Sequence, residues 1–98
     1  MARIKVPGEN REHGVVLYGL TTCKPCKKTM AFLESRGVEY EYMNLDAVDA
    51  EERGEAMMEI ADYLPGRGVA LAYPIIIIDD LICLVGFSES KLTKVLGL

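Results

Sequence analysis

Two cysteines, Cys23 and Cys26, stand three positions apart shortly after an apolar run. Residues at i and i+3 of a helix share one face, so the two sulfurs can meet. Secreted disulfide scaffolds carry larger, even sets of cysteines spread along the chain. A single C-x-x-C pair is instead typical of a redox-active or metal-binding pair. These two sulfurs are therefore the first candidates for chemistry in this sequence.

The position of the pair predicts which sulfur attacks. Cys23 is expected at the N-terminus of a helix, where free backbone N–H groups and the helix dipole favour a negative charge. Lys24, Lys27 and Lys28 add positive charge close to it. We therefore expect Cys23 to favour the thiolate, attack a substrate disulfide and form a mixed disulfide. Cys26, further along the helix and facing inward, then expels the partner and closes the Cys23–Cys26 bond.

A lowered thiol pKa would change the two steps unequally. A fall from ~8.5 to ~6 raises the thiolate fraction at pH 7 from ~3% to ~90%. Nucleophilicity falls together with the pKa, so the net rate of attack rises only about 2–3-fold. The larger benefit lies in the return step, because a thiol of low pKa is the better leaving group.

A metal centre is the alternative use of the pair. Zinc or an iron–sulfur cluster would need two further ligands, and the chain offers only Cys83 and His13. Cys83 lies within an apolar run, where a small buried core residue is the ordinary explanation. His13, the sole histidine, is expected at the surface. We therefore expect no metal and no cofactor besides the redox-active Cys23–Cys26 disulfide.

The elements that must position the pair follow from apolar periodicity and from turn residues. The patterns predict strands over 15–18, 38–45, 75–78 and 81–85, helices over about 24–36 and 50–64, and a last helix capped by Ser88. The first two strands, joined through a helix, should lie parallel. The order β-α-β-α-β-β-α predicts an α/β fold with a four-stranded mixed sheet flanked by helices. Residues 1–13 are expected to form a tail or a short edge strand, and 14–98 a single domain.

The composition restricts the classes of partner. The chain has 98 residues, 50% of them hydrophobic and 27% charged, and a formal net charge of -4. Nucleic-acid-binding proteins usually carry the opposite sign. The apolar runs fall short of the ~18 residues of a membrane span, and no apolar leader for export is visible. We therefore expect a monomeric cytoplasmic protein that binds neither nucleic acid nor membranes.

Three motifs resemble the glutaredoxin-like branch of the thioredoxin superfold. They are the segment 15–26, Tyr73-Pro74 before a strand, and Val85-Gly86-Phe87 before the last helix. The resemblance covers residues 14–98 and implies a thiol–disulfide oxidoreductase in which Pro74 is cis and lies against the cysteines. It further implies a substrate-binding rim formed by Thr22, Lys24, Pro25, Tyr73, Pro74, Gly86 and Phe87. Tyr18 fits this surface and the core equally well.

The electron donor is less sharply indicated. Glutathione-using glutaredoxins have a Lys shortly before the first Cys, a Gly-Gly pair and Asp residues opening the last helix. This chain has Leu20, Gly86-Phe87 and Ser88-Glu89-Ser90 in those places, although Glu89 and Arg67 offer contacts to glutathione. The Gly-Phe pair is similar to NrdH-type redoxins, which take electrons from a thioredoxin-type reductase and deliver them to ribonucleotide reductase. Leu20 departs from that group too, where a Lys is usual.

These comparisons leave several hypotheses, with protein disulfides as the expected substrate. The favoured one is a redoxin linked to a thioredoxin-reductase-type or ferredoxin-linked reductase, with ribonucleotide reductase as a candidate acceptor. Alternatives are a glutathione-dependent glutaredoxin, a metal or iron–sulfur carrier, and a non-catalytic binding module on the same fold. Acids concentrate in 39–62 while lysines follow Cys23, so we also expect charge to orient a partner. The segment 47–72 is expected to contain a longer solvated helix.

Overall fold

The structure, a computed structural model, describes residues 3–64 and 72–98. Its elements in chain order are β1 (Ile4–Val6), β2 (Val15–Gly19), α1 (Lys24–Ser35), β3 (Tyr40–Asn44), α2 (Ala50–Tyr63), β4 (Ile75–Ile78), β5 (Ile82–Val85) and α3 (Glu89–Leu96). The predicted α/β thioredoxin-like fold is confirmed, with element boundaries that differ by two residues at most. None of the helices in 3–64 and 72–98 is long and apolar enough to cross a membrane.

The sheet has five strands in the order β1-β3-β2-β4-β5, so the prediction of four strands was one short. The added strand is β1, which pairs antiparallel with β3 at the edge of the sheet. Two ion pairs fix this edge, from Arg3 to Glu41 at 3.8 Å and from Lys5 to Glu39 at 3.7 Å. The sequence left a tail and a short edge strand open for residues 1–13, and the structure shows the edge strand. Three residues do not decide this alone, because the partner across the edge determines whether the strand forms.

The remaining strands form the centre of the sheet. β2 and β3 are parallel and are joined through α1, as expected. β4 is antiparallel to β2, and β5 is antiparallel to β4. The carboxyl ends of β2 and β3 and the start of β4 therefore lie at one edge of the sheet. The segments that adjoin this edge are those around Cys23, Asp46 and Pro74.

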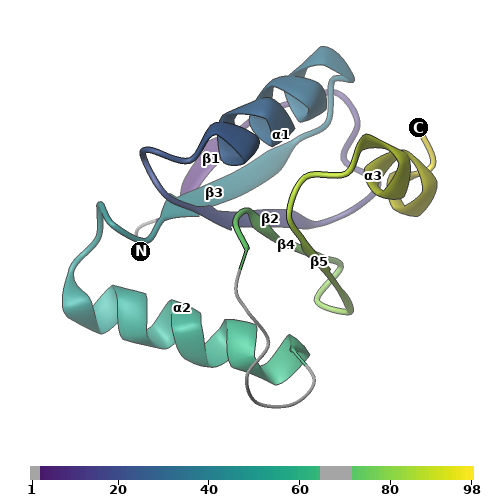
Figure 1. Ribbon diagram of the computed structural model, residues 1–98. Coiled ribbons are helices and arrows are strands. Elements are labelled where there is room, and N and C mark those ends of the chain that lie inside the picture. The colour runs from purple at the N-terminus through teal and green to yellow at the C-terminus, as the bar shows by residue number, and fades with distance from the viewer. Residues whose placement is uncertain (1–2, 65–71) are drawn as a thin grey trace.

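Helices cover both faces of the sheet, α1 and α3 on one face and α2 on the other (Figure 1). The four isoleucines of β4 show this most directly. Ile76 and Ile78 pack in the core beneath α1 and α3, whereas Ile75 and Ile77 pack beneath α2. All four are at most 1% exposed, which confirms that a run without alternation is covered on both faces.

The hairpin between β4 and β5 turns through two aspartates. Asp79 and Asp80 have φ angles of 57° and 52°, the left-handed values that a two-residue hairpin loop of type I′ requires. The Asp79 carboxylate accepts the N–H of Gly14 at 2.7 Å and lies 2.7 Å from His13 Nδ1. These contacts, that of His13 first, lower the pKa of Asp79. His13, expected at the surface, is partly covered by this contact.

Substitution of each turn aspartate by glycine should change the free energy of unfolding differently. Asp80→Gly is expected to raise the free energy of unfolding by about 0.5–1 kcal/mol, because glycine adopts positive φ without steric cost. Asp79→Gly gains the same backbone freedom but loses the contacts to Gly14 and His13, so it should be the less stable variant. Denaturant midpoints of both variants measure the difference. Equal midpoints would show that the Asp79 side chain does not stabilise the hairpin.

Candidate active site

The helix α1 begins at Cys23, which is its N-cap. The backbone of Cys23 is extended, with φ -85° and ψ 113°, and its Sγ accepts the N–H of Cys26 at 3.2 Å. Pro25 lies in the first turn of α1. Backbone N–H groups there have no carbonyl partner within the helix, so the missing N–H of proline costs no hydrogen bond. One of the free N–H groups at the helix start therefore points at the sulfur of Cys23.

Cys23 and Cys26 are joined by a disulfide, with Cα atoms 5.3 Å apart. Their environments differ sharply. Cys23 is partly exposed, whereas Cys26 is only 1% exposed. Gly19, at the end of β2, lies directly against Cys26, since a Cβ added there would come 2.8 Å from Cys26 Sγ. An external group can therefore approach the sulfur of Cys23, while that of Cys26 faces the interior.

The sheet register places Pro74 beside Gly19, the residue that lies against Cys26. Tyr18 pairs with Ile75, so the next residues outward, Gly19 and Pro74, lie level with each other at the edge of the sheet. The Tyr73–Pro74 bond is cis, as the resemblance implied. The carbonyl of Pro74 accepts the N–H of Gly86 at 2.8 Å, which ties the end of β5 to the same edge.

The residues expected to form a substrate-binding rim lie around these cysteines and on the adjoining loops. Thr22, Lys24 and Pro25 are exposed, whereas Tyr73, Gly86 and Phe87 are half-buried and Pro74 is buried. Phe87 makes an edge-on contact with Phe32 of α1, with ring centroids 6.2 Å apart. The structure thus places the three motifs on adjoining segments, and substrate binding by them stays a prediction.

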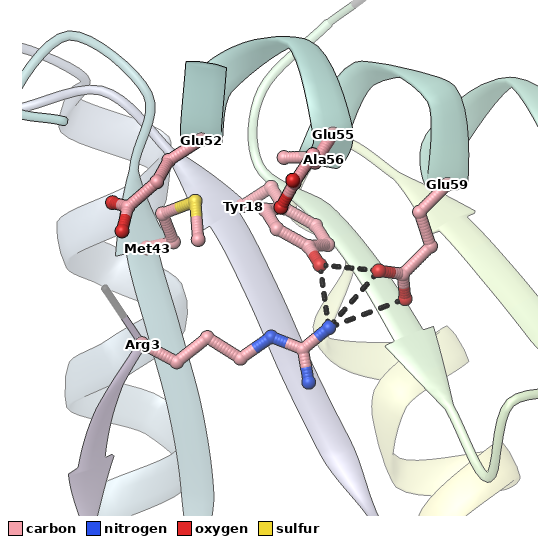
Figure 2. A pocket seen from close by; sticks show the side chains of 7 residues that line it. All are labelled: Arg3, Tyr18, Met43, Glu52, Glu55, Ala56 and Glu59. Atoms are coloured by element: carbon pink, nitrogen blue, oxygen red, sulfur yellow. Dashed lines mark hydrogen bonds and ion pairs between the residues drawn. The ribbon is translucent and has the colours of Figure 1, made fainter. Parts of the chain in front are cut away.

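Tyr18 does not belong to that rim. Its ring is 1% exposed and lies beneath α2, where its hydroxyl donates to Glu59 at 3.0 Å and accepts from Arg3 at 2.8 Å. Figure 2 shows the Arg3 guanidinium reaching from just before the start of β1 towards Tyr18 and Glu59. Arg3, Tyr18 and Glu59 line a cavity of about 200 Å³, and neither Cys23 nor Cys26 is among its lining residues. Tyr18 is thus a core residue that joins β1, β2 and α2.

Sequence reasoning missed a contact that holds the loop before Cys23. Asp46 accepts the backbone N–H of Thr21 at 2.9 Å and its hydroxyl at 2.5 Å. The contact with the hydroxyl is the largest cause of a lowered pKa at Asp46. Asp49 is the cap of α2, accepting the N–H of Glu52 at 2.8 Å. Asp46 follows β3 and Thr21 follows the neighbouring parallel strand β2, and that adjacency was the available signal.

An apolar pocket of about 420 Å³ adjoins this loop. It is lined by Leu20, Leu45, Met57 and Tyr73, with Asp46 and Arg53 at its polar side. Arg53 donates to the carbonyls of Leu45 at 2.8 Å and Val48 at 3.1 Å. Leu20 therefore presents an apolar side chain to this pocket, while its carbonyl accepts the N–H of Cys23 at 3.2 Å. Arg67, which with Glu89 was considered for contacts to glutathione, lies outside the described residues.

The ligands required by the metal hypothesis are not gathered in the described part of the chain. Over 3–64 and 72–98, no group of three His, Cys, Asp or Glu side chains is arranged to hold a metal. His13 precedes β2 while Cys23 follows its far end, and five residues of strand span about 17 Å. Cys83, expected in the core, is half-buried on β5, and this burial raises the pKa of its thiol.

Gly19→Ala tests the close approach to Cys26. The added Cβ should displace the buried sulfur and destabilise the protein by about 1–3 kcal/mol, a typical cost of overpacking. It should also slow closure of the Cys23–Cys26 disulfide. Gly54→Ala is the matched control, because a Cβ there meets open space on α2 and should stabilise by about 0.5–1 kcal/mol. Equal stability and closure rates in both variants would contradict the packing described.

Asp46→Ala tests the two hydrogen bonds by which Asp46 holds Thr21 in the loop before Cys23. We expect it to destabilise the protein and to slow reaction of Cys23 about tenfold through lost positioning. The folded pKa of Asp46 is lowered, so its stabilisation is present above the unfolded pKa and lost as pH falls through the folded value. The stability difference from wild type should therefore shrink in acid. Asp62→Ala, on the exposed side of α2, is the control. An equal loss of stability and of Cys23 reactivity in both variants would show that the Asp46–Thr21 contact does not hold the loop.

Known proteins are similar to this chain in sequence and in fold. The family model for glutaredoxin matches residues 15–81. The glutaredoxin of Methanosarcina mazei Go1 is 33% identical with a TM-score of 0.83, covering 100% of this chain and 90% of its own. Methanoredoxin of Methanosarcina acetivorans is 34% identical with a TM-score of 0.76, covering 87% and 85%.

One curated relative comes from a virus. The Gene 56 protein of Mycobacterium phage D29 is 28% identical over 82 residues, which are 84% of this chain and 81% of the relative. Together with the match over 15–81 and the cysteine pair at the start of α1, these similarities show the family. The chain belongs to the glutaredoxin family.

Proposed function

We propose that the protein is a dithiol–disulfide oxidoreductase that reduces protein disulfides. The observation that carries this proposal is the difference between its two sulfurs. Cys23 is partly exposed and its sulfur accepts a backbone N–H, whereas Cys26 is buried and packs against Gly19. A hydrogen bond to a charged form stabilises that form, so in the dithiol the Cys26 N–H favours a thiolate at Cys23.

The reaction proceeds in two exchanges. The Cys23 thiolate attacks one sulfur of the substrate disulfide, which forms a mixed disulfide and releases the other sulfur as a thiolate that takes up a proton. Cys26 then loses its proton and attacks Cys23, which releases the second substrate thiol. The substrate gains two electrons and two protons, and the protein is left with the Cys23–Cys26 disulfide that the structure shows.

Within this activity we favour a redoxin that a thioredoxin-reductase-type or ferredoxin-linked enzyme regenerates. Leu20 supports this choice, because it lines an apolar pocket at the place where glutathione-using relatives carry a lysine. A carboxylate of glutathione would meet no positive charge from Leu20. Ribonucleotide reductase is the proposed acceptor, and we propose that the protein acts in the cytoplasm as a monomer, without nucleic acid or membrane.

Substitution of each cysteine tests the proposed chemistry. Reduced wild-type protein should reduce the disulfides of a protein such as insulin, and Cys23→Ser should have no activity. Cys26→Ser should stop after the first exchange as a one-to-one mixed disulfide that a dithiol reagent releases. Mass spectrometry of the trapped adduct measures this. Reduction of insulin by Cys23→Ser would refute the assignment.

The oxidised protein distinguishes the electron donors. It should be reduced by NADPH with a thioredoxin reductase, or by reduced ferredoxin with its reductase, faster than by glutathione at a millimolar concentration. Leu20→Lys should raise the rate with glutathione, because it adds a positive charge to the pocket that adjoins the loop before Cys23. Faster reduction of the wild type by glutathione would establish the glutathione-dependent alternative.

A further inference from the structure

A second surface leads away from the dithiol on the side opposite to α2. It is a groove of about 510 Å³ between α1 and α3, lined by Lys28, Ala31, Phe32, Ser35, Arg36, Phe87 and Glu89. Lys24, Lys28, Ala31 and Ser35 repeat at helical spacing and share one face of α1. The face that carries Lys24 between the two cysteines therefore continues into the wall of this groove.

The floor of the groove is aromatic and its wall is basic. Phe32 and Phe87 meet edge-on, and the Arg36 guanidinium lies 5.1 Å from the Phe32 ring centre. Among the ion pairs of the described residues, neither Lys28 nor Arg36 takes part. Both cations are exposed and available to an incoming group.

The acids nearby do not cancel these cations. Glu34, the acid of α1, is held by the hydroxyl of Tyr40 at 3.1 Å, and it does not line the groove. Glu89, in the first turn of α3, is the single acid among the described lining residues. Two cations and one acid leave the groove with a net positive charge. The acidic helix α2 lies on the other face of the sheet (Figure 1).

We propose that this groove binds an acidic segment of the disulfide-bearing protein that Cys23 attacks. Carboxylates of the segment pair with Lys28 and Arg36, and an apolar side chain of the segment packs on Phe87. Twelve residues of α1 extend about 18 Å, a length that about five residues of extended chain match. Carboxylates about two and five residues from the substrate cysteine would meet the two cations. This inference rests on the proposed function and names its substrate class.

Peptide disulfides of matched length test the proposal. Symmetrical disulfides of cysteine-containing heptapeptides would carry Glu, Gln or Lys two and five residues from the cysteine, with the cysteine at either end. In a single turnover the reduced protein breaks one substrate disulfide, forms the Cys23–Cys26 disulfide and releases two peptide thiols, which chromatography measures. At low ionic strength, the second-order rate constant of the reduced protein with the Glu peptide should exceed that with the Gln peptide about fivefold, and the Lys peptide should be slowest. Added salt should remove the difference.

Variants locate the effect. The double variant Lys28→Gln/Arg36→Gln should reduce the preference for Glu peptides to about onefold, whereas Arg36→Lys should retain it and Glu89→Gln should increase it. Lys94→Gln, on the exposed side of α3, is the matched control and should change nothing. Each peptide rate is divided by the rate of the same variant with 2-hydroxyethyl disulfide, because that uncharged substrate does not reach the groove and reports any change in the Cys23 thiolate caused by the loss of Lys28.

The outcomes separate this inference from the proposed function. If the protein reduces 2-hydroxyethyl disulfide but treats Glu, Gln and Lys peptides alike, the inference is wrong and the proposed function stands. If it reduces none of these disulfides, the proposed function itself fails. A dimer in sedimentation that Lys28→Gln/Arg36→Gln dissociates would show that a second copy of this chain occupies the groove, which would also overturn the inference.

Discussion

A helix begins with backbone N–H groups that no carbonyl of its own can accept, and at the start of α1 the sulfur of Cys23 accepts one of them. This contact requires Cys23 to be extended and outside the helix, while Cys26 lies one turn in. The first turn of α1, a helix with one buried face, therefore presents one sulfur to solvent and the other to the core. Gly19 has no Cβ, and the sulfur of Cys26 lies in the space that a Cβ at position 19 would fill.

The sheet turns this local arrangement into a site. Because β2 is parallel to β3 and antiparallel to β4, three loops that are distant in sequence lie at one edge. The loop after β3 supplies Asp46, which holds Thr21, and the segment before β4 supplies Pro74. Hydrogen bonds across these loops fix the nucleophile from outside the helix. Two surfaces then open from it, an apolar pocket towards α2 and a basic groove between α1 and α3.

Features that depend on local sequence were predictable. The continuous apolar runs of β2 and β4, bounded by Gly and Pro, identified the central strands, and the helical spacing of apolar residues with Pro25 in the first turn identified α1. Features that depend on a distant partner were not. Strand β1, which the sequence left open as a tail or an edge strand, forms because β3 offers an edge, and Asp46 binds Thr21 because two parallel strands end side by side. Tyr18 fitted two environments equally from sequence, and only the position of α2 decides that it is buried.

The difference between the two sulfurs is tested most directly by alkylation of the reduced protein over a range of pH, with each labelled cysteine identified by mass spectrometry. The account predicts that Cys23 is alkylated first, with an apparent pKa below the ~8.5 of a free cysteine, and that Cys26 is protected at neutral pH. Alkylation of Cys26 before Cys23, or of both together with the pKa of a free cysteine, would contradict it.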